Sequence, residues 1–167
     1  MSHRFRKFRG KLVQSSLINW LYISTLLLTA CALGQDSQTA ALTSPIGRWE
    51  TVDDASGKGT SVVVIWKENG RLYGRIERLL NPDLQDPYPR CVHCEGEMRD
   101  KPLIGLRILW DLHKDGDQWS GGRVLDPDSG KEYACHIAVE DGGKKLKVRG
   151  FIGFSLLGRT QYWLREK

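Results

Sequence analysis

The chain has 167 residues, 40% of them hydrophobic, and carries 25 Lys and Arg against 20 Asp and Glu, for a formal net charge of +5. The first 34 residues hold five of those cations and no acid, so the remaining residues carry 20 cations against 20 acids and are formally neutral. A neutral domain lacks the positive field that a nucleic-acid backbone attracts, and we expect no nucleic-acid partner.

The N-terminal segment has the composition of an export signal. Five Lys or Arg between Arg4 and Lys11 precede an apolar run from Leu17 to Leu28, which is the order found in secretory signal peptides. We therefore expect residues 1–34 to form a removable signal helix, residues 35–43 a short polar tether, and residues 44–167 the folded domain. The expected location is the bacterial cell envelope, in the periplasm.

Two kinds of cleavage are compatible with this segment. Leu28-Thr29-Ala30-Cys31 resembles the bacterial lipobox, in which the cysteine is lipidated and becomes the new N-terminus. Alternatively, the small residues of Ala32-Leu33-Gly34 suit ordinary cleavage before Gln35. A lipidated Cys31 would anchor the protein on a membrane surface. That anchor is the one membrane association the sequence predicts.

From Ser44 onward the apolar pattern repeats every second residue, as in strands. In one example, Tyr133, Cys135, Ile137 and Val139 form one face of a strand. Turn signals such as Asn69-Gly70 separate the runs. We predict strands at Gly47–Val52, Thr60–Lys67, Arg71–Leu80, Ile104–His113, Gln118–Leu125, Glu132–Glu140, Lys145–Phe151 and Leu157–Arg165.

Eight successive strands with short hairpins favour an all-β fold, an eight-stranded antiparallel up-and-down β-barrel, because closure removes exposed sheet edges. A β-sandwich is the alternative. The segment from Asn81 to Pro102 breaks the alternation, since it holds four of the six prolines and two cysteines. We predict one long loop there, and such loops in compact domains are usually functional or tied down.

The predicted domain keeps three cysteines, Cys91, Cys94 and Cys135. In an oxidising compartment an odd set indicates one disulfide and one free thiol. A bridge from the loop to Cys135 would close about 40 residues and stabilise the fold by roughly 3 to 4 kcal/mol. A Cys91–Cys94 bridge would mainly shape the local turn. The sequence leaves both pairings open.

Two further uses of the loop cysteines are weaker alternatives. Redox exchange through Cys91 and Cys94 normally requires such a pair at the start of a helix. A zinc site would need four ligands, from Cys91, His93, Cys94 and either Cys135 or His136, which face opposite sides of one strand. No nucleophile elbow, phosphate loop or paired metal motif occurs. We expect a non-enzymatic protein without catalytic residues, metal or cofactor.

Tryptophan is frequent in the predicted strands. Five of the six tryptophans fall there: Trp49, Trp66, Trp110, Trp119 and Trp163. Core packing explains them most simply, but eight-stranded barrels also hold one small molecule. We therefore predict a cavity for an apolar or amphipathic ligand or lipid, and we propose as its lining Leu106, Ile108, Trp110, Tyr133, Ile137 and Val148. Candidates for an anionic headgroup are Arg48, Arg149 and Arg159.

The start of the first predicted strand, Gly47-Arg48-Trp49, resembles the Gly-x-Trp opening of lipocalins and related calycins. That resemblance implies a cation–π contact near the closed end of the barrel, between Trp49 and an arginine of the last strand. Arg159 or Arg165 would supply it.

Seven motifs run in unbroken order through the domain: Ser44-Pro45-Ile46-Gly47-Arg48-Trp49, Asn69-Gly70-Arg71-Leu72-Tyr73-Gly74, Cys91-Val92-His93-Cys94, Lys101-Pro102-Leu103-Ile104-Gly105-Leu106, Trp119-Ser120-Gly121-Gly122-Arg123-Val124-Leu125-Asp126-Pro127, Lys147-Val148-Arg149-Gly150-Phe151-Ile152-Gly153 and Leu157-Gly158-Arg159-Thr160-Gln161. With these motifs the whole domain resembles a bacterial exported family labelled domain of unknown function 2147 (DUF2147). The resemblance implies a calycin-like β-barrel in the envelope and no particular activity. A structural or interaction module with a filled barrel is the alternative to ligand binding.

Overall fold

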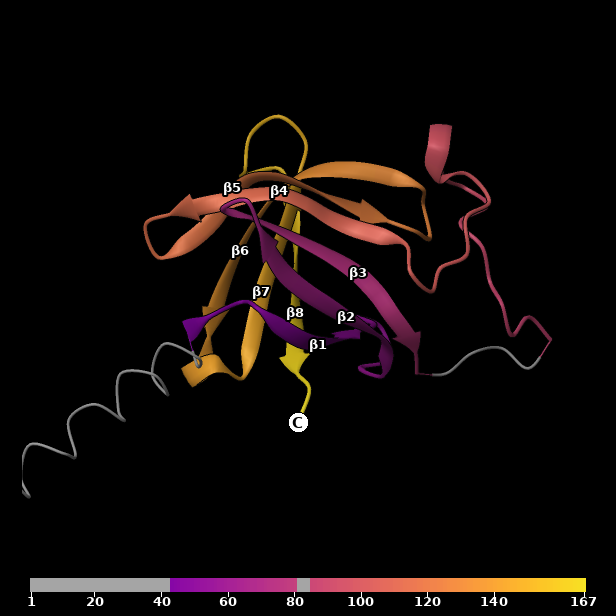
Figure 1. Cartoon of the computed structure of the whole chain (residues 1–167), viewed down its shortest axis with the longest axis horizontal. Coiled ribbons are helices and arrows are strands. Elements are labelled where there is room, and N and C mark those ends of the chain that lie inside the picture. Colours follow the sequence, from indigo (N-terminus) through magenta and orange to yellow (C-terminus); the bar gives the residue numbers. More distant parts are fainter. Residues whose placement is uncertain (1–42, 81–84) are drawn as a thin grey trace, which may run out of the picture. The chain divides into compact units, whose positions relative to one another are not determined.

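Eight antiparallel strands follow one another along the chain and close into a barrel in the computed structural model, which describes residues 43–80 and 85–167 (Figure 1). The predicted signal segment, Cys31 and all but the last residue of the predicted tether lie outside the described residues. The strands are β1 (Gly47–Val52), β2 (Gly59–Glu68), β3 (Arg71–Leu79), β4 (Arg107–Asp115), β5 (Gln118–Asp126), β6 (Lys131–Glu140), β7 (Lys145–Phe151) and β8 (Gly158–Arg165).

Each strand pairs with its neighbours in the chain, and β8 closes the barrel on β1 through Trp49 opposite Arg165 and Glu50 opposite Leu164. The up-and-down barrel is therefore confirmed, and the sandwich alternative is wrong. Two short 3-10 turns, η1 (Gly96–Met98) and η2 (Asp141–Gly143), lie in connections. Among the residues described, no helix is long and apolar enough to cross a bilayer.

The predicted strand boundaries agree with the structure to within one residue except at β4. That strand begins at Arg107 instead of Ile104 and ends at Asp115 instead of His113. Gly105 takes a left-handed backbone conformation with φ of 89°, and the Leu106 N–H donates to the Leu103 carbonyl in a turn. Because this turn breaks the extended backbone before β4, the long loop runs on to Leu106.

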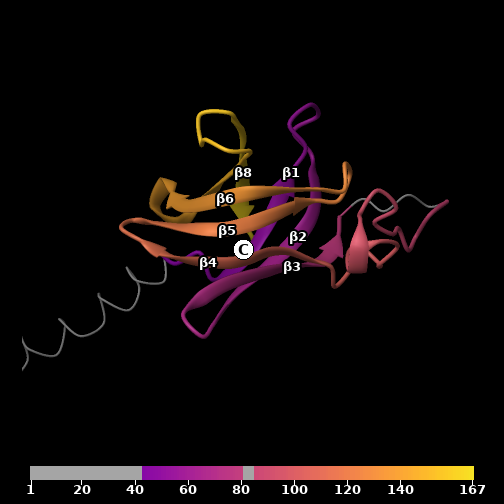
Figure 2. The same ribbon diagram turned by 90° about the horizontal axis from the view of Figure 1, so that it is seen from above.

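The topology gives the barrel two distinct ends. The base holds the start of β1, the turns after β2, β4 and β6, and the C-terminus, whereas the rim holds the connections after β1, β3, β5 and β7. Figures 1 and 2 show the long loop after β3 extending beyond the barrel, and the connection after β7 protruding as a separate loop.

Tryptophan side chains capped by cations seal the base. The indole N–H of Trp49 donates to the Pro45 carbonyl at 2.8 Å, and the Arg165 guanidinium lies 4.1 Å from the centre of the Trp49 ring. The ammonium groups of Lys67 and Lys114 each lie 5.7 Å from the Trp119 ring. Such contacts bury large apolar areas while keeping the charged groups hydrated.

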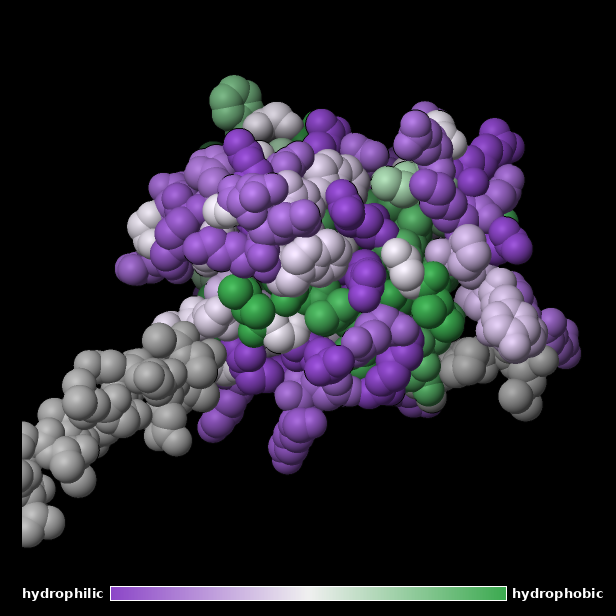
Figure 3. Space-filling model, in the orientation of Figure 1, coloured by the Kyte–Doolittle hydropathy of each residue, from purple (hydrophilic) through white to green (hydrophobic). Residues whose placement is uncertain are grey.

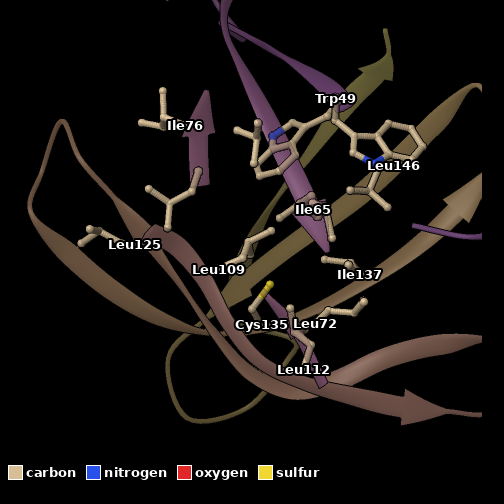
Figure 4. Close-up of a cluster of buried hydrophobic side chains, with 14 of the residues drawn as sticks. Trp49, Ile65, Leu72, Ile76, Leu109, Leu112, Leu125, Cys135, Ile137 and Leu146 are labelled. Atoms are coloured by element: carbon tan, nitrogen blue, oxygen red, sulfur yellow. The ribbon is translucent and has the colours of Figure 1, made fainter. Parts of the chain in front are cut away.

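The interior is filled by alternate side chains from every part of the sheet. Among the side chains labelled in Figure 4, those almost inaccessible to solvent are Trp49, Ile65, Leu72, Leu109, Leu112, Cys135, Ile137 and Leu146. Cys135 lies opposite Gly122 of β5 on one side and Gly150 of β7 on the other. Side chains from both ends of the barrel thus meet in one continuous core.

Candidate binding site

Three of the six residues predicted to line a cavity face the barrel interior. Ile137 pairs with Val148 and with Trp119, and both Ile137 and Val148 are buried. Tyr133 points inward closer to the rim, where it pairs with Val124, and both side chains are only partly buried. Along the inward row of β6, Cys135 and Ile137 are buried, whereas Tyr133 near the rim and Val139 near the base are only partly buried.

The placement of Ile108 and Trp110 corrects the prediction. Leu109 pairs with Gly74 and Val124 and is fully buried inside the barrel, so its two strand neighbours face outward. The reason is a bulge. Asp111 has a φ of 63° and the pairing of β3 with β4 shifts register there, which returns Leu112 to the interior.

Leu106 lies outside the strands, immediately before β4. Its side chain is buried in the hydrophobic core, and its carbonyl accepts a hydrogen bond from the Ile76 N–H at 3.0 Å. It therefore belongs to the junction between the long loop and the barrel rather than to a strand that could line a cavity.

The loop after β3 is docked on the barrel. The Sγ atom of Cys91 lies 3.4 Å from the Pro127 carbonyl oxygen, and a side chain at Gly130 would lie 1.9 Å from the His93 carbonyl oxygen. Ile108 and Leu125 face outward and are still buried, in the same core cluster as the loop cysteines. The loop therefore covers the outer face of β4 and β5 at the rim.

A disulfide joins Cys91 to Cys94 within this loop, with their Cα atoms 5.3 Å apart, and Cys135 is a free, buried thiol. The predicted alternative, a bridge from the loop to Cys135, is wrong, because Cys135 points into the barrel and the loop lies outside it. The joined sulfurs are not available as thiolate ligands, and no cluster of three or more His, Cys, Asp and Glu suited to a metal occurs in the described part of the chain.

Burial makes the Cys135 thiol inert. Removal from water raises the pKa of Cys135 to about 12, so almost no thiolate forms at neutral pH. We expect residues 35–167, kept oxidised, to show no reaction with an aromatic disulfide reagent when native and one reactive thiol per chain in denaturant. The Cys135→Ala variant should lose that thiol, whereas rapid labelling of the native parent would contradict the buried placement.

The arginines considered for an anionic headgroup are engaged within the protein. Arg48 forms an ion pair with Glu77 at 2.6 Å, and Arg159 forms one with Asp54 at 2.5 Å. Arg149 instead donates to backbone carbonyls of the loop after β7. The arginine that contacts the Trp49 ring is Arg165. Arg159, the other candidate for that cation–π contact, pairs with Asp54 instead.

Partly buried apolar side chains occur at both ends of the barrel. Leu79 and Val124 are partly buried against the core at the rim, and Val139 is partly buried near the base, where Trp49, Trp119 and Trp163 are buried. Figure 3 shows apolar surface in a band across the barrel, between β4 and β5 on one side and β1 and β2 on the other. At the rim, the inward-facing side chains that are only partly buried are those of Tyr133 and Val124.

A shallow hollow on the outer surface at the base has a different character. It has a volume of about 340 Å³ and is lined by Glu140, Asp141, Lys145 and Tyr162. Lys145 and Asp141 form an ion pair at 3.4 Å beside it. Its charged lining does not suit the apolar ligand predicted from the sequence, and it lies outside the barrel.

Comparison with known proteins gives one family and one fold. The model of the family described as "Uncharacterized protein conserved in bacteria (DUF2147)" matches residues 47–165. Among solved structures, the chain is similar to protein HP1028 from Helicobacter pylori, described as belonging to the lipocalin family, with a TM-score of 0.64 and 20% identity over 75% of this chain and 84% of that chain. No curated protein matches. At this identity, the structural likeness shows the fold alone.

Proposed function

The chain belongs to the DUF2147 family, and from that premise we propose that it is an exported envelope protein whose lipocalin-like barrel binds a small apolar or amphipathic molecule at the rim. The observation that carries the proposal is that Tyr133 and Val124, which pair and face inward at the rim, are only partly buried. At the base, by contrast, the cation-capped side chains of Trp49 and Trp119 are buried.

The ligand class follows from the residues at the rim. Tyr133 offers an aromatic ring with a hydroxyl, and Val124 and Leu79 offer aliphatic surface. The Arg159–Asp54 ion pair, with Arg159 opposite Gly150, adds a polar edge, and such a lining suits an amphipathic molecule with a large apolar body. An eight-stranded barrel has room for one such molecule at most.

The envelope location rests on the N-terminal segment and agrees with the disulfide. The basic residues and the apolar run before Cys31 favour export. A Cys91–Cys94 disulfide is typical of an oxidising compartment such as the periplasm. The proposal includes retention on a membrane if Cys31 is lipidated, and intact mass of the protein from its own membranes would reveal the acyl chains.

Ligand binding is tested with an environment-sensitive amphipathic probe, anilinonaphthalene sulfonate, on residues 35–167. Tyr133→Arg places a charge at the inner side of the rim and should weaken probe binding at least about tenfold. Ala134→Arg, one residue along β6 and facing outward, should change it less than about twofold. If the two variants weaken probe binding equally, the probe does not bind inside the barrel at the rim.

A second function, that of an envelope interaction module with a filled barrel, is favoured by the complete burial of Leu109, Ile137 and Leu146 in the interior. Native mass spectrometry of the protein purified from its own membranes separates the two proposals. A copurifying small molecule supports ligand binding. Bare protein with partner subunits, together with no probe binding, supports the interaction module.

A further inference from the structure

The loop between β7 and β8 carries an unusual amount of exposed apolar surface. Ile152, Phe154, Leu156 and Leu157 are 67%, 79%, 89% and 73% exposed. No charged residue occurs from position 151 to position 158. The loop protrudes from the rim as the yellow segment at the top of Figure 1. Concentrated apolar surface of this kind marks a site of interaction.

Hydrogen bonds within the protein hold the loop in shape. Arg149 donates through Nε and Nη2 to the Ser155 carbonyl at 2.8 and 2.5 Å, and through Nη2 to the Leu156 carbonyl at 3.3 Å. The Leu157 N–H donates to the Phe154 carbonyl, and the Ile152 N–H donates to the Leu157 carbonyl.

Four consecutive carbonyls, from Phe154 to Leu157, therefore have donors inside the protein. This arrangement matters because an unpaired carbonyl is strongly disfavoured in hydrocarbon. The apolar side chains can therefore enter an apolar medium without carrying these carbonyls in unpaired, and the fixed loop loses little conformational freedom on binding.

The foot of the loop is positively charged. In the part of the chain that the structure describes, Arg149 forms no ion pair with a carboxylate. Its Nη1 atom donates a hydrogen bond to the Thr160 hydroxyl at 2.8 Å. The pKa of the neighbouring His136 is lowered, first by burial and then by the positive charges of Arg149 and Lys147. The Lys147 ammonium forms an ion pair with Glu140 at 3.4 Å. The positive charge at the foot of the loop that no carboxylate pairs with is therefore that of Arg149.

We propose that the β7–β8 loop docks the barrel on an anionic lipid surface, with its four apolar side chains in the interface and Arg149 at the level of the headgroups. The tip carries no charge, and the pairing of its carbonyls from Phe154 to Leu157 within the protein lowers the cost of placing it in an apolar medium. The boundary between headgroups and acyl chains provides both apolar volume and negative charge. The proposal does not depend on whether the barrel binds a ligand.

The test uses residues 35–167, which contain every strand of the closed barrel and exclude the apolar leader. The protein is sedimented with vesicles of phosphatidylcholine containing about one-third phosphatidylglycerol, and with neutral vesicles. Binding to the anionic vesicles should be stronger. Combining Phe154→Ser with Leu156→Ser should weaken it at least about tenfold. The matched control combines Ile46→Ser with Leu164→Ser, two exposed apolar residues at the base.

The control variant should bind within about twofold of the parent, and circular dichroism and thermal melting establish that all variants are folded. The proposal is overturned if the parent does not bind anionic vesicles, or if the loop variant and the control lose binding equally. It is also overturned if the parent binds no vesicles but forms a dimer that the loop variant converts to a monomer. That last result would assign the loop to a second copy of the chain.

Discussion

Replacing Arg165 with Ala should lower the free energy of unfolding by about 3 kcal/mol, seen as a fall of roughly 10 °C in the melting temperature. The guanidinium stacks on the Trp49 ring and donates to the carbonyls of Gly143 and Ser44 at 2.5 and 2.7 Å. Removing it uncovers a buried indole and leaves two carbonyls without their donor. It also weakens closure, because Arg165 is one of the β8 residues paired with β1.

A second arginine of the same strand provides the matched control. Arg159→Ala breaks an ion pair with Asp54 in which both side chains are well exposed, and it should cost less than about 1 kcal/mol. Arg165→Lys keeps the charge but loses the planar fork, so its melting temperature should fall between those of the parent and Arg165→Ala. Equal melting temperatures for Arg159→Ala and Arg165→Ala would contradict a specific role for the base contact.

The barrel was predictable because local and global signals agree along most of the chain. Where a strand keeps a strict two-residue alternation, as from Tyr133 to Val139, sequence and structure assign the same inward face. Turn signals such as Asn69-Gly70 also coincide with the ends of strands, and Asn69 takes the positive φ that this turn needs. Eight such strands in a row leave few ways to hide their edges.

The candidate site was less predictable because a bulge has no clear signature in the alternation. Apolar residues stand at both even and odd positions in β4, so both faces of the strand look apolar. Ile108 and Leu109 were therefore equally plausible inward residues. The choice depends on Asp111 adopting positive φ, and on the loop that then covers Ile108 from outside. Aspartate tolerates that conformation better than most residues, which was the one available local signal.

The sequence left the disulfide pairing open and did not reveal the exposed apolar loop, for different reasons. Cysteine pairing depends on which face of the sheet the loop covers, and no pattern in residues 81–102 specifies this. The loop after β7 was visible as an uncharged stretch between Arg149 and Arg159. Apolar stretches usually indicate burial, however, and only coordinates reveal that these side chains are exposed.

Substituting Ala for Gly122 should destabilise the barrel by at least about 3 kcal/mol or prevent folding. A methyl group at this position would lie 2.3 Å from the Trp110 carbonyl oxygen and 2.6 Å from the Leu112 nitrogen. Both atoms belong to the backbone of the bulge in β4, so the methyl group cannot be accommodated by rotating a side chain. Thermal and denaturant melting of residues 35–167 would measure the loss.

Gly150 provides the control position. Cys135 of β6 pairs with Gly122 of β5 on one side and with Gly150 of β7 on the other. A methyl group there would lie 3.3 Å from the nearest side-chain atoms, of Tyr133 and Val124, and would meet no backbone. Gly150→Ala should therefore cost less than about 1 kcal/mol. If Gly122→Ala melts as the parent does, the bulge is not fixed by close approach of β4 and β5. Ile108 and Trp110 could then turn inward, as strict alternation predicts, and the rim would have a different lining.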